Sequence, residues 1–325
     1  MTQTVFYDRS AFELLRGKKA MLVCDGAYDG FGLRLPCECA SFDDFTANPL
    51  YEDALKGARL LKRSGCDFLV AVGGGSSIDT AKCIKYYSRQ ELPLLAIPTT
   101  AGTGSEATHF AVCYRDGEKR SVADERLLPD YVALLPGMLI TLPIYQRKCT
   151  MLDALCHAIE SWWSRKATAE SIAFSKTAIK LIFDSMDGYL GNTDEGNRVM
   201  LLAANAAGQA INLTTTTAPH AMSYKLTSLY GLPHGHAAAL CLPKVWRYMR
   251  GFEDIAAALG AQGYAGAVSF FEDLLKRLEL YPPKNIGVED FDILAGSVNA
   301  QRLRNHPVLM ERETIKSLYT EILEG

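Results

Sequence analysis

Residues 67–88, DFLVAVGGGSSIDTAKCIKYYS, decide the fold class of this chain. An apolar run ends in three glycines, Gly73 to Gly75, and a segment with helical periodicity follows. Short apolar runs that end at glycine are typical of buried strands. A buried strand that turns through glycine into a helix is the repeating unit of α/β domains with a parallel sheet.

The segments on either side repeat this alternation. Residues 18–25 (KKAMLVCD) and 93–100 (PLLAIPTT) favour strands, and residues 52–65 (EDALKGARLLKRSG) favour an amphipathic helix. Beyond Leu142 the helical period dominates and strand signals almost vanish. We therefore predict an α/β domain with a parallel sheet over residues 1–142, and an all-helical domain over residues 143–325.

Composition argues against several classes of function. The formal net charge of -3 provides no basic face for nucleic acid, and no segment approaches the roughly 18 uninterrupted apolar residues of a membrane span. Residues 1–20 have no apolar core of a signal peptide, and the nine cysteines lack the spacing of a zinc ribbon or a disulfide framework. We expect a cytoplasmic protein that acts on small molecules, without nucleic-acid or membrane partners.

The glycine turn is a candidate phosphate site. Backbone N–H groups at the start of a helix attract phosphate, and glycine allows it to approach closely. Neither common motif is present, because Ile78 replaces the third glycine of G-x-G-x-x-G and no Gly-Lys-Ser/Thr follows. A second loop of small residues, 98–106 (PTTAGTGSE), follows the next strand and would add hydroxyl and N–H groups at the same sheet edge. A turn without a ligand is the alternative for the glycines alone.

The second half of the chain contains four residues of the kind that binds metals. Asp153 and His157 are four apart on a strongly helical stretch, so they share one helix face. His220 and His234 are fourteen apart, and residues 231–233 (GLP) suit a turn between them. Each histidine taken singly is more often structural, but the set favours one site. Three imidazoles and a carboxylate suit Zn²⁺ or Fe²⁺ better than magnesium or calcium.

Four segments together resemble the iron-containing (group III) alcohol dehydrogenase family: GGGSSIDTAK (73–82), IPTTAGTGSEAT (97–108), DALCHAIES (153–161) and PHGHAAALCLPKV (233–245). Asn48-Pro49, Asn205 and Gly208 support the resemblance, which spans nearly the whole chain. It implies an N-terminal dinucleotide-binding domain, a C-terminal helical domain and a homodimer. It also implies an alcohol dehydrogenase linked to NAD(P)H, in which a metal acts as Lewis acid and nicotinamide supplies hydride.

The resemblance assigns site residues by position. The metal-ligand positions correspond to Asp153, His157, His220 and His234. The two cofactor loops correspond to Gly74, Gly75, Ser76 and Asp79, and to Thr99, Thr100 and Thr103.

Asp25 corresponds to the position that meets the adenosine ribose in this family. A carboxylate there accepts hydrogen bonds from both ribose hydroxyls and repels a 2′-phosphate, so we predict NAD(H) rather than NADP(H). The alternative is an aspartate that only forms a turn.

The predicted substrate depends on Tyr224 and Lys225. Tyr224 stands where many members have a further histidine, and residues 220–237 (HAMSYKLTSLYGLPHGHA) most resemble the branch that reduces phosphonoacetaldehyde to 2-hydroxyethylphosphonate in phosphonate metabolism. Lys225 and the hydroxyls of residues 214–217 are candidate phosphonate partners, although the threonine run also suits an irregular helix end. Water, the ribose hydroxyl, His236 or Tyr224 would supply the proton.

Other functions remain open on these residues. A reductase of another short aldehyde and an enzyme similar to zinc glycerol dehydrogenases share this chemistry. A lyase of the dehydroquinate-synthase type is less favoured, because its metal site resembles Glu and two His rather than Asp and three His. The last alternative is a metal-binding or nucleotide-sensing protein that has lost catalysis.

Overall fold

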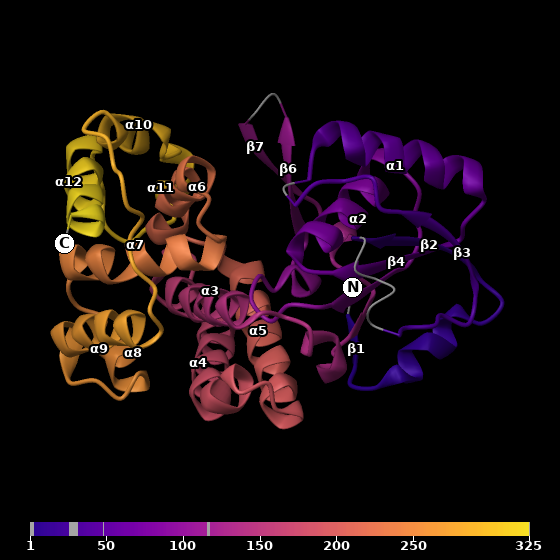
Figure 1. Ribbon diagram of the computed structural model, residues 1–325, viewed down its shortest axis with the longest axis horizontal. Helices are drawn as coiled ribbons and strands as arrows, with labels where there is room; N and C mark the ends of the chain where they lie inside the picture. Colours follow the sequence, from indigo (N-terminus) through magenta and orange to yellow (C-terminus); the bar gives the residue numbers. More distant parts are fainter. Residues whose placement is uncertain (1–2, 26–31, 48, 116–117, 325) are drawn as a thin grey trace. The chain divides into compact units, whose positions relative to one another are not determined.

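The computed structural model describes residues 3–25, 32–47, 49–115 and 118–324 (Figure 1). Asn48, which supports the family resemblance, lies outside the described residues. By its internal contacts the chain divides into two compact units, Met1–Leu142 with Asp187–Gly208, and Pro143–Met186 with Gln209–Gly325. This grouping places residues 187–208 with the first unit, whereas the predicted boundary at residue 142 places them in the second domain.

The first unit contains a six-stranded parallel sheet in the order β1-β8-β5-β4-β2-β3. Its strands are β1 (Thr4–Phe6), β2 (Lys19–Cys24), β3 (Glu38–Phe42), β4 (Phe68–Gly73), β5 (Leu94–Pro98) and β8 (Tyr131–Ala133). Every residue of β4 and β5 is buried, as expected when both faces of a parallel sheet are covered. This burial explains the unbroken apolar run before the glycines.

Successive residues of β4 point to two different cores. Val70 and Val72 pack with one apolar cluster, which includes residues of the 3₁₀ helix η1 (Arg9–Leu15). Leu69 and Ala71 pack with another, which includes residues of α1 (Tyr51–Ser64) and α2 (Gly75–Ser88). The strand therefore keeps the two-residue period of a sheet while both of its faces are apolar.

The rest of the first unit consists of short elements. β6 (Phe110–Arg115) and β7 (Glu118–Ala123) form an antiparallel pair that was not among the predicted strands. The short 3₁₀ helices are η3 (Ser105–Ala107), η4 (Glu125–Leu127) and η5 (Pro136–Leu139).

Only helices occur in the described residues of the second unit, and two of these helices extend into the first unit's residues. The helices are α3 (Ile144–Trp163), α4 (Ala169–Leu190), α5 (Asp194–Thr214), α6 (Ala218–Tyr230), α7 (His234–Met249), α8 (Glu253–Ala258), α9 (Gly263–Arg277), α10 (Asp290–Ser297), α11 (Ala300–Leu303) and α12 (Arg312–Leu323). The predicted fold class, a parallel α/β region followed by a helical region, is confirmed. No described helix is long and apolar enough to cross a membrane.

The predicted turn between His220 and His234 joins α6 to α7. Gly231 ends α6 with φ +70°, a left-handed conformation that favours glycine, and its N–H donates to the carbonyl of Thr227. Pro233 then precedes the first residue of α7, where its fixed φ suits a helix start. α7 packs against both α3 and α6, and this packing brings the predicted metal ligands together.

Candidate metal centre and cofactor loops

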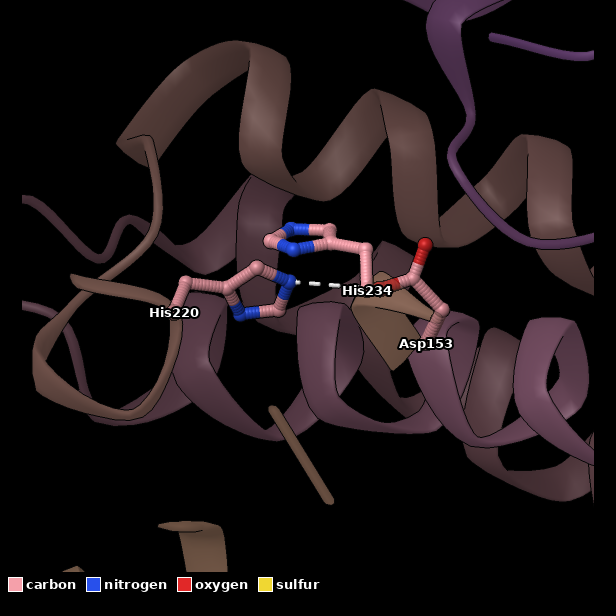
Figure 2. Close-up of side chains that lie close together, drawn as sticks. All are labelled: Asp153, His220 and His234. Carbon is pink, nitrogen blue, oxygen red and sulfur yellow. Dashed lines mark hydrogen bonds and ion pairs between the residues drawn. The ribbon is translucent and has the colours of Figure 1, made fainter. Parts of the chain in front are cut away.

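Three of the four predicted metal ligands converge. The ligand atoms of Asp153 on α3, His220 on α6 and His234 on α7 all lie within 4.8 Å of one another (Figure 2). Asp153 and His220 are buried, and His234 is half-buried. A carboxylate and two imidazoles at this separation suit Zn²⁺ or Fe²⁺, so the donor set fits a divalent metal.

His157, the fourth predicted ligand, lies beside this group but is not part of it. Its ring stacks on the ring of His220, with 4.4 Å between centroids and 16° between planes. It is buried one helical turn after Asp153 on α3. Direct metal ligation by His157 therefore stays a prediction.

A glycine allows α7 to start directly against α3. A Cβ at Gly235 would lie 2.1 Å from the carbonyl oxygen of Cys149 and 2.7 Å from the Cβ of Asp153. Real Cβ atoms do not approach that closely, so only glycine fits here without displacement of the backbone. The close approach places His234, the residue before it, next to Asp153.

The ionisation of the group is set by opposite charges within the buried site. Burial alone would raise the pKa of Asp153, but the nearby histidines lower it below its usual range. Burial likewise disfavours the charged form of His220, but Glu160 and Asp153 together raise its pKa to about 10. Asp153 is therefore ionised at neutral pH, which is the form that binds metal.

Hydrogen bonds hold both converging histidines. The Nδ1 atom of His220 is hydrogen-bonded to Oε1 of Glu160, and its Nε2 atom lies 3.4 Å from Oδ1 of Asp153. The Nδ1 atom of His234 lies 3.3 Å from the hydroxyl of Ser223, which donates to the carbonyl of His220. Sequence reasoning did not single out Glu160 or Ser223, although Glu160 lies in segment 153–161 and Ser223 lies between His220 and His234.

Tyr224 and Arg302 form a stack beside the metal group. The ring of Tyr224 lies against that of His234, and the guanidinium carbon of Arg302 lies 4.8 Å from the centroid of the Tyr224 ring. Nη1 of Arg302 also donates a hydrogen bond to the Tyr224 hydroxyl at 3.0 Å. Arg302 was missed because it lies on α11, far along the chain and outside any motif.

The other predicted catalytic residues differ in their surroundings. His236 is buried, its Nδ1 is hydrogen-bonded to the Tyr145 hydroxyl at 3.0 Å, and burial lowers its pKa to about 4. His236 is therefore neutral at pH 7, which does not favour proton donation by its ring. Lys225 is half-buried on α6.

Two of the four threonines at residues 214–217 are buried in the protein interior. Thr214 and Thr217 are fully buried, and their hydroxyls are hydrogen-bonded to Ser161 and Glu160 respectively. Thr215 has φ +63°, just after α5 ends. The irregular helix end is thus the interpretation that the structure supports for this run, and Thr214 and Thr217 are not exposed to a substrate.

In the first unit the two predicted cofactor loops lie side by side at the carboxyl ends of β4 and β5. A Cβ at Gly75 would lie 2.9 Å from the side chain of Thr103, and one at Gly74 would lie 3.2 Å from that of Thr100. The backbone N–H of Thr99 donates to the carbonyl of Gly73 at 3.0 Å. Ligands bind at this edge in open α/β sheets.

Other predicted cofactor residues have structural contacts in the same region. Oδ1 of Asp79 accepts from the hydroxyl of Ser105, and its Oδ2 accepts from the N–H of Val112 at 2.9 Å. The hydroxyl of Ser76 donates to the carbonyl of Ala47. Asp25 directly follows β2 and is exposed. Binding of a cofactor by these residues stays a prediction.

The side chain of Lys82 holds the end of the second cofactor loop and the residues that follow it by hydrogen bonds to their backbone. It is fully buried, and Nζ donates to the carbonyls of Ser105, Thr108 (2.8 Å) and Phe110 (3.0 Å). Burial lowers its pKa to about 8. This lysine lies in the GGGSSIDTAK segment, but nothing in the sequence pattern predicted a buried position for it.

Comparison with known families accounts for most of the chain. The model for "Iron-containing alcohol dehydrogenase" matches residues 9–136, and that for "Fe-containing alcohol dehydrogenase family, C-terminal" matches residues 148–323. The chain belongs to the iron-containing alcohol dehydrogenase family. The predicted enzyme class, an NAD(P)-dependent metal-containing alcohol dehydrogenase or aldehyde reductase, is thereby confirmed.

Individual members of the family are similar over most of their length. The phosphonoacetaldehyde reductase of Streptomyces viridochromogenes is 29% identical, with 81% of this chain and 78% of that protein covered. The 1,3-propanediol dehydrogenase of Klebsiella pneumoniae is 33% identical, with 76% and 73% covered.

Solved structures of family members superimpose along nearly the whole chain. The sulfoacetaldehyde reductase of Bifidobacterium kashiwanohense, solved in complex with NAD+, has a TM-score of 0.89 and 25% identity, with 98% of this chain and 96% of that chain covered. The iron-containing alcohol dehydrogenase of Thermotoga maritima has a TM-score of 0.87 and 28% identity, with 100% and 99% covered.

Proposed function

We propose that this alcohol dehydrogenase uses NADH to reduce a short aldehyde that carries a phosphonate or similar acidic group, with a divalent metal held by Asp153, His157, His220 and His234. The observation that carries the metal site is the convergence of Asp153, His220 and His234 within 4.8 Å. A metal bound there would supply Lewis acidity toward a carbonyl group. Asp153 contributes the negative charge of the site, and the hydrogen bonds of His220 and His234 orient their rings.

The acidic substrate is supported by the cations next to this group. Arg302 lies against Tyr224, whose ring stacks on His234, and Lys225 follows Tyr224 on α6. A guanidinium donates paired hydrogen bonds to the oxygens of phosphonate or sulfonate, which an uncharged aldehyde cannot accept. Two relatives are named for substrates of this kind, phosphonoacetaldehyde and sulfoacetaldehyde.

A neutral short aldehyde is the second candidate substrate, because the 1,3-propanediol dehydrogenase is the more identical relative by sequence. Steady-state rates of NADH oxidation with phosphonoacetaldehyde, sulfoacetaldehyde and propanal distinguish the two. We expect kcat/KM to be highest for one of the two acidic aldehydes. A higher kcat/KM for propanal than for both would reject the acidic substrate.

Preference for NADH rests on Asp25. Its exposed carboxylate at the end of β2 suits two ribose hydroxyls and would repel a 2′-phosphate. We expect the KM for NADPH to exceed that for NADH, and Asp25→Ser to narrow the difference; equal KM values in the unaltered enzyme would reject this role. The choice between Fe²⁺ and Zn²⁺, the homodimer, the cytoplasmic location and the lack of nucleic-acid or membrane partners remain predictions.

A further inference from the structure

Glu160 is a buried carboxylate whose two oxygens face different partners. It lies on α3, two helical turns after Asp153, and is completely shielded from solvent. Its Oε1 atom is hydrogen-bonded to Nδ1 of His220. Its Oε2 atom accepts hydrogen bonds from the backbone N–H of Thr217 at 2.7 Å and from the Thr217 hydroxyl at 2.8 Å. A buried carboxylate is retained only when such partners satisfy it.

Of the two groups at Oε2, one can only donate, and the other is placed to donate. A backbone N–H always donates. The Thr217 hydroxyl receives a hydrogen bond from Nε1 of Trp163 at 2.8 Å, and an indole N–H cannot accept. Because an ionised carboxylate can only accept, the hydroxyl proton of Thr217 points toward Oε2 of Glu160. The group at the position of Oε2 must be an acceptor.

The acceptor role of Glu160 also determines which ring nitrogen of His220 carries a proton. An ionised carboxylate accepts at both oxygens, so Nδ1 of His220 must carry a proton and donate it to Oε1. The opposite ring nitrogen, Nε2, lies 3.4 Å from Oδ1 of Asp153 within the metal group. Nε2 is therefore the ring nitrogen that gives up its proton when a metal binds, and its lone pair then serves the metal.

We propose that Glu160 is a positioning residue that keeps Nε2 of His220 available to the metal, with Trp163 and Thr217 holding Glu160 in its accepting orientation. The proposal rests on the metal site of the proposed function and extends it to residues that touch neither metal nor substrate. The chain of hydrogen bonds runs from Trp163 through Thr217 and Glu160 to His220.

Glu160→Gln tests this chain with almost no change in shape. The two Thr217 donors require the amide oxygen of glutamine at their position, so the amide NH₂ must face Nδ1 of His220. Nδ1 of His220 then becomes the acceptor, and the imidazole ring carries its proton on Nε2, where the proton blocks the metal. Loss of a hydrogen-bond partner of this kind lowers metal affinity by about 10- to 100-fold.

The measurement is the Zn²⁺ dissociation constant of the full chain, determined by competition with a chromophoric chelator after metal has been removed. Glu106→Gln is the matched control, because Glu106 is also buried and hydrogen-bonded to an uncharged partner, Asn205, but belongs to the first unit and has no hydrogen bond to His220. Glu160→Gln should bind Zn²⁺ about 10- to 100-fold more weakly, and Glu106→Gln should bind it like the unaltered chain. Equal affinity for Glu160→Gln and the unaltered chain would overturn the proposal.

The ¹⁵N spectrum of the His220 ring provides a second test that does not depend on a variant. In the Zn²⁺-loaded protein, Nδ1 should carry a proton and Nε2 should bind the metal. Metal bound at Nδ1 would overturn the proposal even if Glu160→Gln fails to fold. His220→Ala tests the metal site separately from the role of Glu160. If His220→Ala abolishes Zn²⁺ binding while Glu160→Gln leaves Zn²⁺ binding intact, the metal site is supported and the role of Glu160 is rejected.

Discussion

The ring of Tyr224 lies nearly parallel to the ring of His234, with 6° between the planes and 5.2 Å between the centroids. Arg302 contacts the same tyrosine through its guanidinium group. This arrangement places a permanent positive charge two side chains away from the metal group. The aromatic ring of Tyr224 thus connects a predicted metal ligand to a cation.

Arg302→Met should reduce activity selectively toward acidic aldehydes. The variant keeps an apolar stem against Tyr224 but removes the charge, and hydrogen bonds to charged groups contribute about 1.5–3 kcal/mol. We expect kcat/KM for phosphonoacetaldehyde to fall about 10- to 100-fold, with propanal changed by less than about threefold. Arg304→Met, at an exposed position two residues further on, serves as control and should alter neither value. Equal losses for both aldehydes would remove Arg302 from substrate recognition.

Gly235→Ala should disturb the metal group through the backbone. The added Cβ would lie 2.1 Å from the carbonyl oxygen of Cys149, so α7 must move away from α3. Overpacking of this kind typically costs about 1–3 kcal/mol of unfolding free energy. We expect a lower Tm in metal-free protein and weaker Zn²⁺ binding. Gly137→Ala is the control, because no atom lies within 4 Å of its added Cβ, and a variant at Gly235 that behaves like this control would contradict the packing account.

Stability should depend on His306 in mild acid. The ring is completely buried, and burial lowers its pKa to about 4 from the 6.5 of an exposed histidine. Between these two pKa values the unfolded chain binds a proton that the folded chain does not. The contribution of His306 to the free energy of unfolding is therefore complete above pH 6.5 and is lost as the pH falls toward 4. The contribution is at most about 1.4 kcal/mol per pH unit.

His306→Leu removes this titration. Urea unfolding of metal-free protein at pH 7 and pH 5 should show a smaller loss of unfolding free energy for the variant than for the unaltered chain. Identical losses in the two proteins would show that His306 titrates normally or does not contribute to acid sensitivity.

The sequence predicts the sheet region well because its signals are local. The run before Gly73 is uniformly apolar since β4 is buried on both faces, and the glycines are needed where α2 meets Thr100 and Thr103. Asp153 and His234 could be singled out for a similar reason, because each lies within a motif, and His220 lies on the segment that leads to His234. The grouping of residues 187–208 could not be predicted, since it depends on close packing of Gly208 on Gly104, where a Cβ on Gly104 would lie 2.5 Å from the Cα of Gly208.

The partners of the metal group were harder to predict than its ligands. Glu160 resembles any helical glutamate in the sequence, and its partners, Thr217 and His220, contact it only in the folded helical unit. Arg302 belongs to a four-residue helix without a motif. Buried hydrogen bonds between distant segments leave no periodic signal in a single sequence.

The dependence of aldehyde reduction on a metal at Asp153, His220 and His234 tests the central claim most directly. The rate of NADH oxidation with phosphonoacetaldehyde is measured after removal of metal by a chelator, and again after addition of Fe²⁺ or Zn²⁺. The rate should vanish in the metal-free protein, return at about one metal ion per chain, and remain absent in His220→Ala at every metal concentration. Full activity of the metal-free protein, or of His220→Ala, would contradict the account.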